Sequence, residues 1–409
     1  MKSTSALFAL MLTASLAVGE DWPQWRGPGR DDVSTETGLL QQWPAGGPAL
    51  AWKASGLGEG YSGVAIAKGR IYTMGDLGES SFLLALDAAN GKVIWSTKVG
   101  KSGGNYPGPR CTPGVDGDQV VTLGQFGDLV CVSAADGKER WRHNLQSEFG
   151  GKMMSGWGYA ESPLVDDGKV ICTPGGAQGT LIALDKKTGA VVWRSREWTD
   201  KSSYSSIIIA TINGVRQYVQ LTDASVGAVS PKDGSLLWRA PRPGKVAVVP
   251  TPIFADDSVY VTSGYNIGCN LFKVEKTGGG FAARQVYENK EMKNHHGGVV
   301  KVGDYLYGHS EGKGWVCQAF KTGALVWNEK SKLGKGSIGY ADGHLYLRLE
   351  GGNGTVVLAE ATDKGYIETG RFDQPDRSDK NSWPPPVIAG GKMYLRDQDV
   401  LLVYDVKAK

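Results

Sequence analysis

The sequence predicts an all-β protein, an eight-bladed β-propeller built from four-stranded antiparallel blades. Two observations support this prediction: a short motif ending in Trp recurs along the chain, and its copies are regularly spaced. The motif Trp residues at positions 95, 141, 193 and 238 are separated by 46, 52 and 45 residues, and the next lies at 327. Repeats of this length, with several short strands each, are typical of propeller blades.

Five copies of the motif are well formed, and in each the Trp stands four residues after a Gly. They are "LLALDAANGKVIW" (83–95), "LVCVSAADGKERW" (129–141), "LIALDKKTGAVVW" (181–193), "VGAVSPKDGSLLW" (226–238) and "VCQAFKTGALVW" (316–327). Three weaker copies complete the set: "LFKVEKTGGGFAARQVY" (271–287), "VVLAEATDKGYIETGRF" (356–372) and "LLVYDVKAK" (401–409). The chain therefore contains eight repeat units.

Each unit predicts four antiparallel strands. An alternating apolar segment such as "DDGKVICTPGG" precedes each motif and forms two strands around a Gly turn, and the motif supplies two more around its own Gly. Glycine provides the positive φ that the hairpin requires, and the Trp is suited to packing between neighbouring blades.

The last repeat lacks a fourth strand, and a spare strand exists at the other end of the chain. "PALAWKA" (48–54) contains Trp52 but has no motif before it. We expect this segment to complete the last blade, which closes the ring and removes its open sheet edges. The propeller domain then covers residues 48–409, and residues 20–47 form an N-terminal extension.

Residues 1–19 are expected to be a secretory signal peptide. Lys2 begins a positive region, "ALFALMLTASLAV" is an apolar core too short to span a bilayer, and Ala17-Val18-Gly19 is a small-residue cleavage site. We therefore expect a periplasmic or secreted protein without an integral membrane segment. The first cysteine is Cys111, so no cysteine is available near the cleavage site for a lipid anchor.

The net charge and the cysteines count against two further kinds of function, nucleic-acid binding and metal binding by cysteines. Lys+Arg number 45 and Asp+Glu 42, a net charge of +3 that does not favour nucleic-acid binding. The five cysteines are an odd number without CxxC spacing, so at least one is unpaired and a cysteine metal site is not predicted.

The "ALDxxxGxxxW" repeats resemble those of the pyrroloquinoline-quinone (PQQ) dehydrogenase-like superfamily of eight-bladed propellers. That superfamily includes quinoprotein alcohol dehydrogenases and the propeller lipoprotein of the outer-membrane assembly machinery. The resemblance covers residues 48–409 and implies the fold, because the repeat Trp and Gly residues hold blades together in every member. Function has to be inferred from the channel mouth.

Loops that lead into the innermost strands open at the channel mouth, together with the loops between second and third strands. These loops are rich in aromatic and charged residues, as in "NYPGPRCTP" (105–113), "SGWGYAESP" (155–163), "KNHHGG" (293–298) and "NSWPPP" (381–386). We expect a small-molecule site there. The predicted substrate-binding residues are Tyr61, Tyr106, Arg110, Trp157, Tyr159, Tyr204, Asn294, Lys335 and Trp383.

Three of the five histidines fall within one blade: His295, His296 and His309. If the backbone is extended at 295–296, the two adjacent side chains face opposite ways and do not bind one metal together. One then faces the channel, and His309 approaches it across the hairpin. A substrate or acid/base role, hydrogen bonding within the blade wall, and a metal site are the three interpretations open for these residues.

Three charged residues at the channel mouth each have two interpretations. Glu161, beside Trp157, is either a general base with a raised pKa or a carboxylate bridging blades. Arg110 either binds an anionic group bidentately or forms an ordinary ion pair. Lys335 is either a second cation of the site or an ordinary surface charge.

The resemblance also implies a cofactor. Quinoprotein alcohol dehydrogenases hold PQQ between a Trp platform and a ring of adjacent cysteines, with a calcium ion bound nearby. By that comparison, Trp157 or Trp383 would be the platform, Arg110 would contact PQQ, and Glu161 with Asn294 would bind calcium. This sequence departs from the pattern, because it has neither adjacent cysteines nor a CxxCH haem site. Electrons would therefore pass to a separate acceptor.

Three functions remain open from the sequence. The first, which is the preferred interpretation, is an exported quinoprotein-type dehydrogenase that oxidises an alcohol, polyol or sugar at the channel mouth. The second is a non-enzymatic scaffold resembling the outer-membrane assembly lipoprotein. The third is a propeller that binds or cleaves carbohydrate without a redox cofactor, and the Trp, Tyr and His residues at the mouth are consistent with it.

Overall fold

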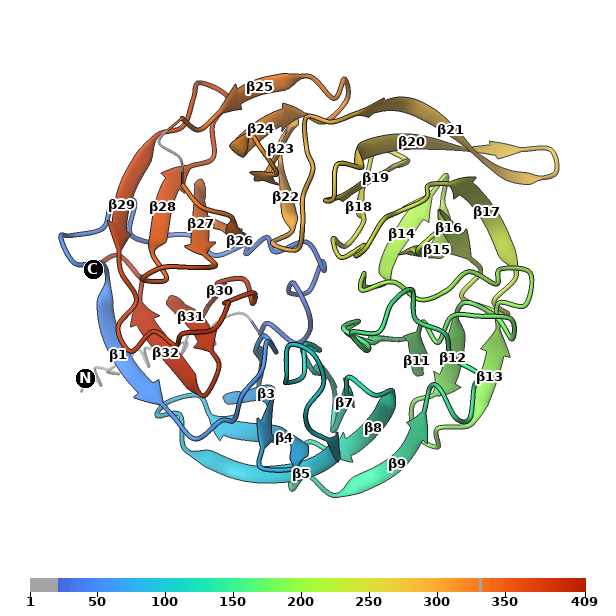
Figure 1. The fold of residues 1–409 in the computed structure, drawn as a ribbon, viewed down its shortest axis with the longest axis horizontal. Coiled ribbons are helices and arrows are strands. Elements are labelled where there is room, and N and C mark those ends of the chain that lie inside the picture. The colour runs from blue at the N-terminus through green and yellow to red at the C-terminus, as the bar shows by residue number, and fades with distance from the viewer. Residues whose placement is uncertain (1–20, 331–332) are drawn as a thin grey trace, which may run out of the picture.

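The computed structural model describes residues 21–330 and 333–409, and over these ranges the strands form eight four-stranded antiparallel sheets. The sheets stand around a central axis as the blades of a propeller (Figure 1). The eight-bladed fold predicted from the repeats is confirmed. Within the same ranges, no helix is long and apolar enough to cross a membrane. The expected signal peptide lies outside the described residues.

Blades 1 to 4 follow one another along the first half of the chain, each with its first strand nearest the axis. Blade 1 contains β2 (Ala65–Ala67), β3 (Arg70–Leu77), β4 (Ser80–Asp87) and β5 (Val93–Lys101); blade 2 contains β6 (Gly114–Asp116), β7 (Gln119–Leu123), β8 (Asp128–Ser133) and β9 (Glu139–Asn144). Blade 3 contains β10 (Leu164–Asp166), β11 (Lys169–Cys172), β12 (Ile182–Asp185) and β13 (Val191–Arg194); blade 4 contains β14 (Ile208–Ile212), β15 (Val215–Leu221), β16 (Ser225–Val229) and β17 (Leu236–Pro241).

Blades 5 to 8 complete the ring. Blade 5 contains β18 (Ile253–Ala255), β19 (Ser258–Ser263), β20 (Gly268–Thr277) and β21 (Gly280–Asn289); blade 6 contains β22 (Val299–Val302), β23 (Tyr305–Ser310), β24 (Gly314–Ala319) and β25 (Leu325–Asn328). Blade 7 contains β26 (Gly336–Ala341), β27 (His344–Leu349), β28 (Val356–Glu360) and β29 (Glu368–Phe372); blade 8 contains β30 (Val387–Ala389), β31 (Lys392–Asp397), β32 (Val400–Asp405) and the N-terminal strand β1 (Ala49–Ala54).

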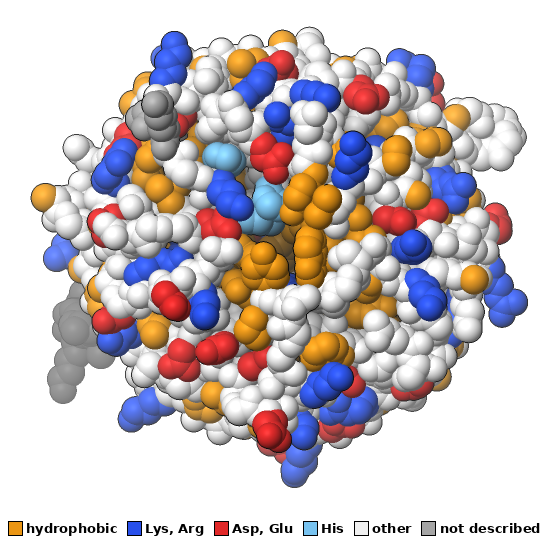
Figure 2. Space-filling model, in the orientation of Figure 1, with side chains coloured by type: hydrophobic (Ala, Val, Ile, Leu, Met, Phe, Trp, Pro, Cys, Tyr) orange, Lys and Arg blue, Asp and Glu red, His pale blue; other side chains and the backbone are white. Residues whose placement is uncertain are grey.

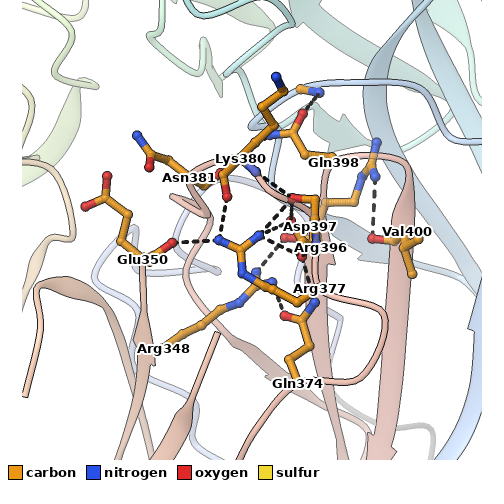
Figure 3. Close-up of polar contacts among 12 residues, drawn as sticks. Arg348, Glu350, Gln374, Arg377, Lys380, Asn381, Arg396, Asp397, Gln398 and Val400 are labelled. Atoms are coloured by element: carbon orange, nitrogen blue, oxygen red, sulfur yellow. Dashed lines mark hydrogen bonds and ion pairs between the residues drawn. The ribbon is translucent and has the colours of Figure 1, made fainter. Parts of the chain in front are cut away.

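The ring is closed by β1, as the sequence predicts. β1 pairs antiparallel with β32 from Ala49↔Asp405 to Ala54↔Leu401. The joint is reinforced nearer the axis by buried arginines of blades 7 and 8 (Figure 3). Arg396 on β31 donates from Nη2 to the carbonyls of Leu57 (3.1 Å) and Gly58 (3.0 Å) in the chain that leads to blade 1. These contacts tie the C-terminal blade to the first blade through side chain as well as backbone.

The Trp and the Gly of the repeated motif interlock neighbouring blades. Trp193 Nε1 of blade 3 donates to the Pro231 carbonyl of blade 4 (3.1 Å), and a Cβ on Gly234 of blade 4 would lie 2.4 Å from the Trp193 ring. The same arrangement joins Trp95 to Gly137 and Trp141 to Gly189. Each of these motifs therefore supplies an indole ring to the following blade and a glycine surface to the preceding one.

Blade 5, whose motif copy lacks the Trp, keeps this contact with a different side chain. Tyr287 on β21 occupies the place of the Trp: its hydroxyl donates to the Phe320 carbonyl of blade 6 (2.8 Å), and its ring lies 2.7 Å from a Cβ placed on Gly323. Trp238, which precedes this irregular blade, instead donates to Gln217 Oε1 in its own blade (2.7 Å). The motif can thus lose its Trp without losing the blade contact.

The N-terminal extension runs into the centre of the ring before it reaches β1 (Figure 1). Trp22 forms a β-bridge with Ile66 on β2, and Val33 forms one with Tyr340 on β26. Residues 22–34 therefore lie against the innermost strands of two different blades, inside the channel.

The glycine contact gives a direct test of how the blades are held. Gly234 and Gly69 share the same φ of +73°, but a Cβ on Gly234 meets the Trp193 ring, whereas one on Gly69 meets nothing within 4 Å. We expect Gly69→Ala to lower the free energy of unfolding by about 1–2 kcal/mol through backbone strain alone. Gly234→Ala should lower the free energy of unfolding by about 1–3 kcal/mol more than Gly69→Ala does, because its methyl group also displaces the indole ring of Trp193.

Urea unfolding of both variants measures the difference. Equal losses in the two variants would show that the Trp–Gly contact does not hold the blades.

Candidate functional site

A cavity of about 190 Å³ lies at the channel mouth. Figure 2 shows the hollow at the centre of this face, with hydrophobic, histidine, basic and acidic side chains around it. The predicted site residues that line the cavity are Tyr61, Tyr106, Arg110, Trp157, Tyr204, His295, His296, Lys335 and Trp383. The loops leading into the innermost strands therefore do meet at one place.

Four predicted site residues do not line the cavity: Tyr159, Glu161, Asn294 and His309. Tyr159 is buried, and its hydroxyl donates to the Pro174 carbonyl (3.0 Å). His309 packs edge-on against Trp315, with ring centroids 5.6 Å apart. These two side chains belong to the blade walls.

Three aromatic or charged residues that were not predicted from the sequence also line the cavity: Trp25, Tyr265 and Glu350. Glu350 follows β27 and lies in the loop between the second and third strands of blade 7, so its position in the repeat was the available signal. Tyr265 lies in the equivalent loop of blade 5, "GYNIG". Trp25 lies outside the repeats, and the repeat pattern gave no signal for it.

Aromatic rings form one wall of the cavity. Tyr61 and Trp383 are stacked with ring centroids 3.9 Å apart, and Tyr106 lies 5.6 Å from Trp383. Trp157 meets Tyr106 edge-on at 6.4 Å and lies 6.1 Å from Tyr204. Because these residues come from the loops of several different blades, the wall exists only when the ring is assembled.

Glu350 is the polar centre of the cavity. Its carboxylate accepts hydrogen bonds from His296 Nε2 (3.1 Å) and Trp383 Nε1 (3.0 Å) and pairs with Lys335 Nζ (3.1 Å). Burial alone would raise the pKa of this carboxyl, but the three donors outweigh burial and lower the pKa to about 2. Glu350 is therefore an anion throughout the neutral pH range.

The backbone of Glu350 is fixed by an arginine beside it (Figure 3). Arg377 Nη2 donates to the Glu350 carbonyl (2.7 Å), and Arg377 Nη1 pairs with the buried Asp397 (2.9 Å). The amide of Ser382, next to Trp383, donates to the same carbonyl (3.2 Å). The loop that carries Trp383 is thus anchored to the strand end that carries Glu350.

His295 and His296 face the same cavity, with ring centroids 4.8 Å apart. The expectation that they face opposite ways is wrong, because the backbone bends at this point and β22 begins only at Val299. His295 Nε2 lies 2.8 Å from the Tyr265 hydroxyl. Burial, with neighbouring His296 and Lys335, lowers the pKa of His295 to about 4, so its ring is neutral at pH 7.

Arg110 does not present a free guanidinium to a ligand. Its Nη1 donates to Gln125 Oε1 (3.1 Å) and the Trp157 carbonyl (2.9 Å), and its Nη2 donates to the carbonyls of Asn105 (3.1 Å) and Tyr106 (2.8 Å). The expected bidentate grip on an anion would break these bonds. Arg110 instead holds the loops of Tyr106 and Trp157 together.

Glu161 and Asn294, the calcium ligands implied by the resemblance, do not fit that role. Glu161 is fully buried, and its two oxygens accept bonds from Thr173 N (2.7 Å) and Thr173 Oγ1 (2.9 Å). The Asn294 amide nitrogen donates to the Gly298 and His309 carbonyls (2.9 and 3.0 Å), and its oxygen accepts from Gly298 N. Both side chains fasten their loops, and neither lines the cavity.

The fold and the cavity define the class of protein: an eight-bladed propeller with a small-molecule-sized pocket at its channel mouth. The PQQ_2 family, described as "Outer membrane protein assembly factor BamB", matches residues 79–319. That is more than half of the chain, and the chain belongs to this family of PQQ-like repeat propellers.

Several curated proteins share part of the sequence. The serine/threonine-protein kinase AfsK of Streptomyces griseus is 29% identical over 187 residues, covering 44% of this chain and 21% of the kinase. The assembly factor BamB of Shewanella oneidensis is 24% identical over 265 residues, 58% of this chain and 61% of that protein. The quinohemoprotein alcohol dehydrogenase ADH-IIG of Pseudomonas putida is 27% identical over 139 residues, 32% of this chain and 18% of the enzyme. The chain thus matches less than two thirds of the length of each.

Solved structures agree on the fold. BamB from Moraxella catarrhalis superposes with a TM-score of 0.59 at 16% identity, covering 82% of this chain and 94% of that one. The quinohemoprotein alcohol dehydrogenase ADHIIG of Pseudomonas putida HK5 gives a TM-score of 0.60 at 13% identity, covering 95% and 80%. At these identities the likeness shows the propeller fold alone.

The burial of Glu161 predicts a pH effect on stability. Burial, opposed by the Thr173 hydrogen bonds and by Arg30, raises the pKa of this carboxyl from 4.5 to about 8. Between these pH values the folded chain keeps a proton that the unfolded chain has lost, so the free energy of unfolding falls as pH rises. Glu161→Gln removes the titrating group, so its free energy of unfolding should not show this decline. Relative to the wild type, the variant should therefore become more stable as the pH rises from 5 to 8.

Urea unfolding of both proteins at several pH values measures the gain. Parallel stability curves would mean that Glu161 is ionised in the folded protein, as an accessible site residue would be.

Proposed function

We propose that this protein is an exported binding propeller whose channel-mouth cavity holds a sugar- or polyol-sized molecule. The observation that carries the proposal is the combination of an aromatic wall with one fixed carboxylate, Glu350, in the same small cavity. Export rests on the signal-peptide pattern of residues 1–19 and on relatives named as outer membrane protein assembly factors.

The size and the lining of the cavity support a small polar ligand. Pockets for drug-sized ligands measure about 300–1,000 Å³, and this cavity, at about 190 Å³, is smaller. Aromatic faces such as those of Tyr61 and Trp157 bind the apolar C–H faces of a sugar ring, while a buried carboxylate accepts hydrogen bonds from its hydroxyl groups. Both kinds of contact are available within one cavity.

The cavity also contains groups suited to moving a proton. His295 is neutral at pH 7, because burial lowers its pKa, and its Nε2 lies at hydrogen-bond distance from the Tyr265 hydroxyl. A neutral imidazole can accept a proton from a bound hydroxyl, and a phenol can return one. Any conversion of the ligand would therefore be acid–base chemistry at His295 and Tyr265, with Glu350 holding the ligand.

The quinoprotein interpretation would place PQQ and calcium in this cavity, with an alcohol as substrate and a separate electron acceptor. PQQ, when bound with calcium, supplies an electrophilic quinone for alcohol oxidation. The buried positions of Glu161 and Asn294 and the engagement of Arg110 by four oxygen acceptors of the protein weigh against it.

A scaffold role is the second candidate, and the family match favours it. The assembly factors that share the repeat are named for outer membrane protein assembly. In that role a partner protein would be the ligand, and the mouth cavity would not need to bind a sugar.

Calorimetric titration of the mature chain with glucose, glucuronate and sorbitol tests the proposal. We expect saturable binding of at least one of them, with a Kd of about 1 mM or tighter. Glu350→Gln should weaken binding by about tenfold or more, because charge-assisted hydrogen bonds contribute about 1.5–3 kcal/mol each. Glu368→Gln is the matched control: Glu368 also pairs with a cation, Arg371, but lies on the outermost strand β29.

Two results would contradict the proposal. In a parallel titration with PQQ, binding that requires calcium would support the dehydrogenase instead. Failure of all three probes to bind would leave the scaffold role as the better explanation.

A further inference from the structure

The N-terminal segment 22–34 is held inside the channel by contacts with several blades. Besides the bridges from Trp22 to blade 1 and from Val33 to blade 7, the Val115 amide of blade 2 donates to the Pro23 carbonyl (2.8 Å). Arg30 Nη2 donates to the Ser162 carbonyl ahead of blade 3 (2.6 Å), and Arg26 Nη2 to the Val299 carbonyl of blade 6 (2.6 Å). The partners lie on, or directly before, innermost strands, so the segment is fixed from several sides of the channel. We call residues 22–34 the channel segment.

Buried charges fix the conformation of the channel segment. Arg26 Nε lies 2.8 Å from Asp32 Oδ2, and both side chains are almost fully buried. The Asp32 carbonyl also accepts from the Tyr340 amide of blade 7 (2.9 Å). A buried ion pair of this kind is costly unless further bonds fix its geometry. Here the Val299 carbonyl of blade 6 accepts from the Arg26 side chain, while the Tyr340 amide of blade 7 holds the backbone of Asp32. The segment therefore has one defined position in the channel.

Trp25 is the residue of the channel segment that reaches the cavity. Its Nε1 donates to Thr251 Oγ1 ahead of blade 5 (3.0 Å), and its partly exposed ring lines the cavity. The neighbouring Trp22 and Arg26 are buried and do not line it. The cavity is thus bounded by repeat-derived loops around its sides and by Trp25 from the channel segment.

We propose that Trp25 is the floor of the ligand site, and that the channel segment makes the cavity a blind pocket. This inference rests on the proposed function and narrows its ligand class. A chain-like ligand cannot pass along a channel that the segment occupies, so only a free sugar or the terminal ring of a glycan can enter. Trp25 stacks against that ring at the bottom of the pocket and sets how deep it lies.

The first test compares affinities of the full mature chain for whichever of glucose and glucuronate binds. Trp25→Ala should weaken binding by about tenfold, the effect of one lost aromatic contact, and Trp25→Phe should restore most of the affinity. Trp327→Ala is the matched control, because Trp327 is also partly buried but lies on β25 at the outer edge of its blade. It should lower the melting temperature and leave the affinity unchanged. Unchanged affinity in Trp25→Ala, with binding lost in Glu350→Gln, would overturn the inference and leave the proposed function standing.

The second test needs no sugar. The five native cysteines are free and buried, so an introduced thiol can be followed against a low background. Trp25→Cys should react with a small, water-soluble methanethiosulfonate in the folded protein, whereas Trp22→Cys should react only after unfolding. An unreactive Trp25→Cys would show that position 25 does not face the cavity and would overturn the inference even if no sugar binds the wild type.

Discussion

The contact between a ring of one blade and the glycine of the next is the constraint on which the rest of the structure depends. It fixes the spacing between neighbouring sheets, because Gly234 leaves room for the Trp193 ring and for nothing larger. Once that spacing is set around the ring, the loops at the channel mouth have little freedom to approach or separate. Blade 5 shows that the constraint concerns shape rather than residue type, since Tyr287 preserves the contact where the motif Trp is lacking. The position and size of the cavity therefore depend first on how the blades pack, and only then on the side chains that line it.

Buried polar groups at the site divide into those that hold loops and those that remain available to a ligand. Arg110, Arg377 and Asn294 each donate to at least one backbone carbonyl and so secure a loop that ends at the cavity. Glu350, by contrast, gathers side-chain donors around its carboxylate inside the cavity, and His295 keeps a neutral ring there because burial lowers its pKa. The loop-holding groups thus position the ligand-facing groups through the backbone. This division explains why several charged residues at the mouth are unsuited to direct contact with a ligand.

Repeats made the fold predictable from sequence, because a glycine, a Trp and a constant spacing have the same structural meaning in every blade. The same repeat also showed that Tyr61 and Trp383 lie at the channel mouth, because it places the loops that carry them at that end of the channel. Tyr159 was misplaced, and the two interpretations of Glu161 stayed open, because the sequence of a feeding loop does not show which of its side chains face the cavity and which face the blade wall. Glu161 in fact bridges Thr173 of blade 3 and Gln220 of blade 4. The backbone bend at His296 could not be read from the sequence either, and it turns His295 and His296 toward the same cavity. Trp25 was out of reach for another reason: it belongs to a segment that the repeat does not describe, and its partner Thr251 is 226 residues away.

Closure by β1 and β32 has a consequence for how the protein is made. The two strands that join the ring lie at opposite ends of the domain, with Ala49 paired to Asp405. Blades 1 to 7 are each complete within one stretch of chain and can form as they are synthesised, whereas blade 8 has to wait for β30–β32. Until then β1 has no partner strand, and such an open edge invites pairing with other chains. The nascent protein is therefore vulnerable to aggregation until β32 has been made, and a chain cut before this strand would stay in that vulnerable state.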